Sequence, residues 1–158
     1  GINTMNKTMS SLLEMMRSAD LVNYAGTVGR SALVAGNEMF FDGQNPVGFA
    51  LQFAKPMPKA SLQITDTSGN IVKTMELGAV KTDLMNMFWD GLDAEGKPMT
   101  AGSYRIVAKG IDGATEATPN AFVSSVVAAV GRTGNDINLT LADGKKILPK
   151  DVVQWVIQ

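Results

Sequence analysis

The stretch from Phe88 to Tyr104, F-W-D-G-L-D-A-E-G-K-P-M-T-A-G-S-Y, constrains this chain most because it joins two apolar, strand-like runs through a dense set of turn residues. Aspartates cap their own backbone in turns, and glycines tolerate the positive φ that turns require. Two rings at the inner ends are large enough to clamp the loop, and each has a polar atom that needs a partner when buried. The pattern therefore predicts a structural hairpin rather than a binding site, with these fixed points: Trp89, Asp90, Gly91, Asp93, Gly96, Gly102 and Tyr104.

Two clusters of turn residues, at 42–46 and 118–120, enclose a region rich in short apolar runs. Within it, apolar residues alternate with small or polar ones, which is typical of strands with one buried face. Pro56 and Pro58 are expected to break the chain after the first of these strands. Five or more strands at this spacing predict a β-sandwich of immunoglobulin or fibronectin-III type, with runs at 47–53, 62–66, 71–77, 84–89 and 104–108.

Shorter apolar runs flank this region on both sides. Residues 31–34 and 39–41 suggest one or two strands, and 122–130 suggests another that ends at Gly131. Residues 136–141 alternate, Asp143-Gly144 favours a tight hairpin, and 149–156 fits either a short helical turn or a last strand. Because neither flank is long enough to bury a core alone, residues 30–42 and 121–158 are expected to form one small barrel. The sandwich at 43–120 would then be an insertion.

The amino-terminal segment carries a heptad pattern on one face of a helix. Its apolar residues are spaced alternately by three and four: Ile2, Met5, Met9, Leu12, Met16 and Ala19. Gly26 and Gly29 mark the end of the helical stretch, so residues 1–29 form a helical segment. Met5, Met9, Leu12 and Met16 make a candidate seam for self-association. The pattern fits equally a helix packed on its own domain, or one frayed because its partner segment is missing.

Composition excludes several classes of function. Fourteen basic and fifteen acidic residues give a net charge of −1, and the basic residues are scattered, which disfavours a nucleic-acid or anionic-membrane partner. The chain has neither Cys nor His, which removes disulfides, thiolate metal sites and the usual general base. The longest apolar stretch, at 121–130, is too short for a membrane span, which needs roughly 20 residues. The chain begins at Gly1 without an initiator Met, so we expect a fragment or a processed product.

No catalytic, cofactor or metal site emerges from the motifs. Asp90, Asp93 and Glu95 crowd one loop, but the twelfth position counted from Asp90 is Ala101, where a calcium loop of the EF-hand type needs Glu. Turn-forming carboxylates are therefore favoured over calcium ligands. A complete Gly-rich phosphate loop is absent: residues 91–97 read G-x-x-x-x-G-K, but Pro98 follows where a P-loop needs Ser or Thr, and no G-x-G-x-x-G occurs. Of the methionines beside the loop, Met85 or Met87, whichever faces inward, is interpreted as core filler.

The sequence W-D-G-x-D-x-x-G followed by x-G-x-Y resembles the immunoglobulin-like domain of bacterial flagellar hook-capping proteins. Further matching pieces are the segment 21–30, the hairpin at 64–72, and Asp143-Gly144 with residues 151–153. The resemblance covers almost the whole chain and lacks the amino-terminal portion that directs export in the family. It implies a mainly β fold: an immunoglobulin or fibronectin-III-like sandwich inserted into a small, split, tudor-like β-barrel and preceded by an amino-terminal helix.

The resemblance also implies a function. A hook-capping protein is a non-enzymatic, exported homo-oligomer at the distal end of the growing hook, with the flagellar hook protein as its partner and no cofactor. The alternative is a secreted β-sandwich that binds a ligand, such as a carbohydrate-binding module. Such a module displays exposed aromatic rings in one plane, so that reading requires Trp89 and Tyr104 on the surface. A small enzyme is disfavoured because His and Cys are missing.

Overall fold

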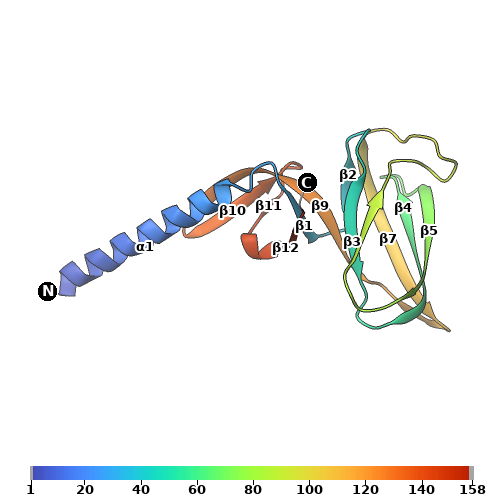
Figure 1. Cartoon of the computed structure of the whole chain (residues 1–158), viewed down its shortest axis with the longest axis horizontal. Coiled ribbons are helices and arrows are strands. Elements are labelled where there is room, and N and C mark those ends of the chain that lie inside the picture. The colour runs from blue at the N-terminus through green and yellow to red at the C-terminus, as the bar shows by residue number, and fades with distance from the viewer. Residues whose placement is uncertain (1, 157–158) are drawn as a thin grey trace. The chain divides into compact units, whose positions relative to one another are not determined.

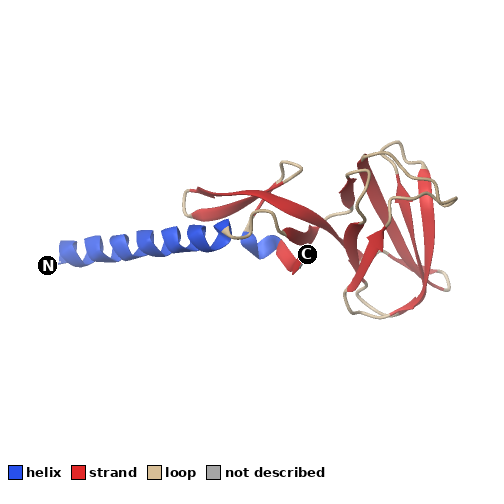
Figure 2. Ribbon diagram, turned by 45° about the horizontal axis from the view of Figure 1, so that its top comes forward, coloured by secondary structure: helices blue, strands red, loops and turns tan. Residues whose placement is uncertain are grey.

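The computed structural model describes the backbone of residues 2–156 and, within the amino-terminal helix, the side chains of residues 3–11, 21 and 23–25. The chain divides into two compact units (Figure 1). The first unit combines the residues up to Ala32 with those from Val126 onward, and the second unit is Leu33–Ser125. Most elements in both units are strands (Figure 2), which confirms the predicted mainly β fold.

The second unit is a sandwich of two antiparallel sheets. The first, here the β7 sheet, has the order β2-β7-β4-β5, with the short β8 also paired to β7. Its strands are β2 (Glu38–Phe41), β4 (Met57–Thr65), β5 (Ile71–Val80), β7 (Gly102–Asp112) and β8 (Thr115–Ala117). In the second, here the β3 sheet, β3 lies between β6 and the first residues of β9. Its strands are β3 (Val47–Gln52), β6 (Met85–Trp89) and β9 (Asn120–Thr133).

Buried and exposed side chains alternate along β7, which places the core between the two sheets. On β7, Tyr104, Ile106 and Ala108 are buried while Arg105 and Val107 between them are exposed. A period of two turns every second side chain to the same face, so one apolar face is buried and the other is solvated. Facing residues of the β3 sheet complete the core: Val47, Phe49, Leu51 and Trp89. The predicted immunoglobulin-like sandwich is therefore confirmed.

The first unit consists of a helix and a small sheet. Helix α1 (Ile2–Ala25) ends directly before Gly26, as the sequence predicted. Strands follow in the spatial order β10 next to β11 on one side and β9 on the other, with β1 and β12 beyond β9. Their bounds are β1 (Ser31–Ala35), β10 (Asp136–Leu141), β11 (Lys146–Ile147) and β12 (Val152–Val156), with a 3₁₀ turn η1 at Pro149–Asp151. Val127, Leu139, Leu141 and Ile147 form the buried side of this unit.

Several local expectations need correction. Pro56 lies in the break between β3 and β4 as expected, but Pro58 is already the second residue of β4, where the pairing with β5 is irregular between Met57 and Ala60 and leaves room for a residue without an N–H. Gly131 does not end β9, which continues to Thr133 in pairing with β10. The segment 149–156, for which a helical turn and a strand were alternatives, contains both. Among the described residues, no helix is apolar over the length that crossing a bilayer requires.

The boundary between the units also differs from the predicted one at residues 42–43. Strand β2 pairs along its whole length with β7, from Glu38 opposite Arg105 to Phe41 opposite Gly102, so 33–42 belongs to the sandwich. The turn cluster at 42–46 is therefore an internal loop between the two sheets. In it the Asp42 carboxylate accepts hydrogen bonds from the backbone N–H groups of Gln44 and Asn45, both at 2.8 Å.

Candidate functional site

Three aromatic rings meet where the Phe88–Tyr104 loop joins the sandwich. Trp89 is fully buried and Tyr104 nearly so, and their ring centroids lie 4.7 Å apart. Phe41 on β2 completes the cluster, with its centroid 5.2 Å from that of Trp89 and 6.4 Å from that of Tyr104. Sequence reasoning missed Phe41, because it lies on another strand that only the β2–β7 pairing brings here. The Phe40-Phe41 pair in an alternating run was the available signal.

The polar atoms of the two larger rings hold the two ends of the loop. The Trp89 indole N–H donates to the Leu92 carbonyl at 2.9 Å, and the Tyr104 hydroxyl donates to the Thr100 carbonyl at 2.6 Å. In immunoglobulin-type sandwiches a tyrosine hydroxyl that returns to the backbone a few residues upstream is known as a tyrosine corner. Because both polar atoms bond inside the loop and both rings are buried, the rings offer a ligand no accessible face.

The carboxylates of the loop organise its backbone. Asp90 accepts a hydrogen bond from the Leu92 N–H at 3.0 Å, and Asp93 accepts from the N–H groups of Glu95 and Lys97, both at 2.9 Å. Aspartates that bond to the backbone two to four residues later stabilise tight turns. Within the described part of the chain, no group of three acidic side chains is placed to hold a metal ion.

Gly91 and Gly96, two of the loop glycines with positive φ, have very different surroundings. Gly91 has φ 80°, and a Cβ there would lie 2.2 Å from Cζ of Phe41. Gly96 has φ 82°, but a Cβ there would meet nothing within 4 Å. Gly91 therefore allows the backbone to approach the aromatic cluster closely, whereas Gly96 serves the turn alone. Gly102 also has positive φ, at 156°, at the start of β7.

Two other aspartates cap loops of the sandwich in the same way. At the turn between β4 and β5, hydrogen bonds from the backbone and the side chain of Asn70 lower the pKa of Asp66 below 3.8. In the loop between β2 and β3, hydrogen bonds from Asn45 and Gln44 lower the pKa of Asp42 in the same direction. Bonds of this kind favour the charged carboxylate over the protonated form. These groups are structural: Asp42 is exposed and Asp66 is half-buried.

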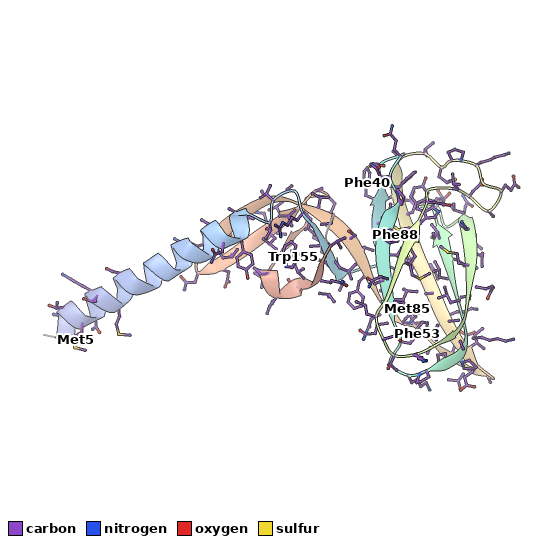
Figure 3. The ribbon with its side chains drawn as sticks, in the orientation of Figure 1. Met5, Phe40, Phe53, Met85, Phe88 and Trp155 are labelled. Carbon is purple, nitrogen blue, oxygen red and sulfur yellow. The ribbon has the colours of Figure 1, made fainter. Side chains whose placement is uncertain are left out.

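The predicted seam of α1 is described only in its first part. Met5 and Met9 are 68% and 61% exposed, so most of each side chain is accessible to solvent. Figure 3 labels Met5 near the amino-terminal end of the helix. The side chains of Leu12 and Met16 lie outside the described residues. Met85 and Met87 both face the sandwich core and are half-buried there.

Comparison with known proteins gives the same family throughout. Residues 36–114 match the FlgD Ig-like domain family. The chain is 24% identical to the basal-body rod modification protein FlgD of Salmonella typhimurium and 22% identical to that of Escherichia coli K12. Both matches extend over 148 residues and cover 88% of this chain but 64% of the relative. The chain thus spans somewhat less than two thirds of the length of these relatives.

Solved structures share the fold. FlgD from Xanthomonas campestris, whose crystal structure is described as giving insights into the hook capping essential for flagellar assembly, superposes with a TM-score of 0.72 at 24% identity. That match covers 86% of this chain and 99% of the Xanthomonas chain. FlgD from P. aeruginosa gives a TM-score of 0.69 at 23% identity, covering 80% of this chain and 96% of that one.

Proposed function

This chain belongs to the FlgD family, and we propose that it is part of a scaffold that caps the growing flagellar hook and promotes assembly of hook-protein subunits. The observation that carries this proposal is the match of the sandwich at residues 36–114 to the FlgD Ig-like domain. The curated relatives are named for modification of the basal-body rod, and one structural relative is described in terms of hook capping. Such a protein would be exported and would work outside the cell at the distal end of the hook.

A steric, non-enzymatic mechanism agrees with the chemistry of the chain. A scaffold needs rigid bodies that present surfaces to arriving subunits, and the aromatic cluster with its two loop hydrogen bonds provides a rigid sandwich. The carboxylates at the loop are engaged in backbone hydrogen bonds. We propose that the first unit is a tudor-like barrel into which the sandwich is inserted, so that β1 and β9 link the two bodies.

Self-association is the second part of the proposal. A cap on a tubular filament requires several copies, and the exposed Met5 and Met9 supply the start of a heptad seam on α1. Methionine side chains are flexible and can adapt their shape to different partners, which suits an interface that has to be rearranged. The partner that the cap steers would be the flagellar hook protein, and neither nucleic acid nor a membrane is required.

The alternative, a secreted ligand-binding module, required Trp89 and Tyr104 on the surface in one plane. Their exposed fractions are 0% and 4%, and their planes are inclined by 61° to each other. A planar sugar-binding platform is therefore not available from these two rings.

Complementation tests the scaffold. The full-length gene that encodes this chain is expressed in a bacterium that lacks its own hook cap, and hooks on cells and hook protein in the medium are measured. Restored hooks with little free hook protein are expected. If the protein is exported from a host with matched hook protein and subunits still leak into the medium, the capping role is wrong.

A further inference from the structure

Strand β6 forms an unprotected edge of the sandwich. Within residues 33–125, β6 pairs with β3 on one side and with no strand on the other. In an antiparallel pair every second residue turns its N–H and C=O away from the partner strand. The outer edge of β6 therefore presents backbone donors and acceptors that only another extended chain can pair in series.

The absence of charge sets β6 apart from the edge strands of the β7 sheet. The edge strands β2, β5 and β8 carry Glu38, Lys73 with Glu76, and Glu116 respectively, which is how proteins commonly discourage edge pairing. Strand β6, Met-Asn-Met-Phe-Trp, has no charged residue. Its neighbour β3 and residues 120–125 of β9 have none either, so the whole β3 sheet in this unit is uncharged. Along residues 85–89 a charged segment would lose hydration without meeting an opposite charge, since the charged groups at the end of the strand, Asp90 and Lys73, lie 3.8 Å from each other as an ion pair.

Phe88 makes the outer face of this edge apolar. It is 69% exposed, and its ring lies over Gly48 of β3, with Cε1 3.5 Å from where a Cβ on Gly48 would be. Asn86 and the buried Ala50 form the next pair along the ladder, so small side chains lie beside the ring. The Phe88 ring covers Gly48 with one side, and most of the ring remains exposed to water. Figure 3 shows Phe88 on this strand.

The inner face of the same edge is lined by adaptable, half-buried side chains, and at its Trp89 end the following loop bonds to β5, where the Ala94 N–H donates to the Val72 carbonyl at 3.1 Å. Met85 and Met87 on β6 are half-buried, and so are Met75 and Leu77 on β5, the edge strand of the other sheet. Met85 and Leu77 pack against a buried cluster of Phe53, Met57, Ala60 and Val80. The core is therefore covered in the middle of the sandwich and only partly covered along this side, where a further apolar strand would complete it.

We propose that β6 is a docking strand, to which an extended, uncharged, apolar segment of the hook protein adds by antiparallel or parallel strand pairing. That the segment comes from the hook protein rests on the proposed function. That β6 is an uncharged, apolar edge strand follows from the structure of the sandwich alone. Backbone pairing would supply affinity, and alternate apolar side chains of the segment would contact Phe88 on one face and the methionines on the other.

The test measures binding of purified hook protein, and of overlapping peptides that span it, to this 158-residue chain. Hydrogen exchange of the amides of residues 85–89 is the readout specific to strand addition. Hook protein and one or a few peptides are expected to slow exchange at β6. Phe88→Lys should weaken that binding by about tenfold or more, because it places an unpaired charge in the pairing surface.

Phe40→Lys is the matched control, because Phe40 is a 63% exposed phenylalanine on β2 of the other sheet. It should leave binding and β6 exchange unchanged, and unchanged far-UV circular dichroism would show that both variants fold.

If folded Phe88→Lys binds hook protein as well as the unsubstituted chain does, and the amides of β6 still exchange freely, the proposal that β6 is a docking strand is wrong and the hook-protein interaction still stands. If the chain does not bind hook protein at all, both the proposed partner and the docking role of β6 are wrong. β6 protection that rises with chain concentration without hook protein would identify a second copy as the occupant and overturn the proposal.

Discussion

The indole ring of Trp89 meets the phenol ring of Tyr104 edge to face, with centroids 4.7 Å apart and planes inclined by 61°. Trp89 ends β6 in one sheet and Tyr104 lies on β7 in the other, so this ring contact joins the two layers of the sandwich. Each ring also donates a hydrogen bond to a carbonyl of the loop between them. A single cluster thus fixes both the packing of the sheets and the conformation of the loop.

Trp89→Phe tests how much the indole contributes. The substitution removes the hydrogen bond to the Leu92 carbonyl and leaves a cavity at a fully buried site, so the free energy of unfolding should fall by about 2 kcal/mol or more. Urea unfolding followed by circular dichroism measures this. Phe88→Leu, next to it but exposed, should change the free energy by no more than about 0.5 kcal/mol. Equal effects from both changes would contradict the structural role of Trp89.

Gly91→Ala should be far more destabilising than Gly96→Ala. Both glycines have φ near 80°, so the backbone strain that alanine adds is similar, about 1 kcal/mol. At Gly91 the new methyl would also overlap the buried ring of Phe41, so the total loss should reach about 3 kcal/mol. Thermal and urea unfolding of both variants give the difference. In the Phe41→Leu background Gly91→Ala should cost less, and an unchanged cost would rule out the steric explanation.

Local chemistry was sufficient to predict the loop but not its third ring. Asp90, Asp93 and Gly96 act through bonds and dihedrals within a few residues, which composition and spacing reveal directly. Phe41 reaches the cluster through the pairing of β2 with β7, and that long-range register is decided by tertiary packing. The predicted domain boundary at residues 42–43 was wrong for the same reason, because a cluster of turn residues does not show with which unit the preceding strand pairs.

The docking surface that we propose on β6 could likewise be predicted only in part from the sequence. Alternation in Met85–Trp89 indicates that Phe88 and Trp89 face opposite sides, and the burial of Trp89 follows from the loop motif. That β6 is an edge strand depends on the order of strands in the sheet, which the sequence does not encode locally. Pro58 was expected to lie in the break between two strands because a regular ladder needs the N–H that proline lacks, yet the irregular pairing at the start of β4 removes that need.

Acid should destabilise the sandwich partly through Asp66. Hydrogen bonds from Asn70, followed by the Ser68 N–H, lower its folded-state pKa below the ordinary value of 3.8. A lowered pKa adds stability above the unfolded-state value, and this contribution is lost as pH falls through the folded-state pKa. The melting temperature should therefore decline below pH 3.8, and less steeply in Asp66→Asn. Asp42→Asn should give a separate, additive effect. Identical pH profiles for both variants and the unsubstituted chain would refute the assignment.

Self-association should depend on the exposed end of the α1 seam. Met5 and Met9 lie about one helical turn apart on the same face of α1, and more than 60% of each side chain is exposed. Packing them against a partner helix would therefore remove apolar area from water. Met5→Glu with Met9→Glu should shift the chain to monomer over a concentration series in sedimentation equilibrium. Ser10→Glu adds a charge to the exposed helix outside the heptad positions and should leave association unchanged. If the unsubstituted chain is monomeric throughout, or if the double variant associates equally well, the seam is not the contact between copies.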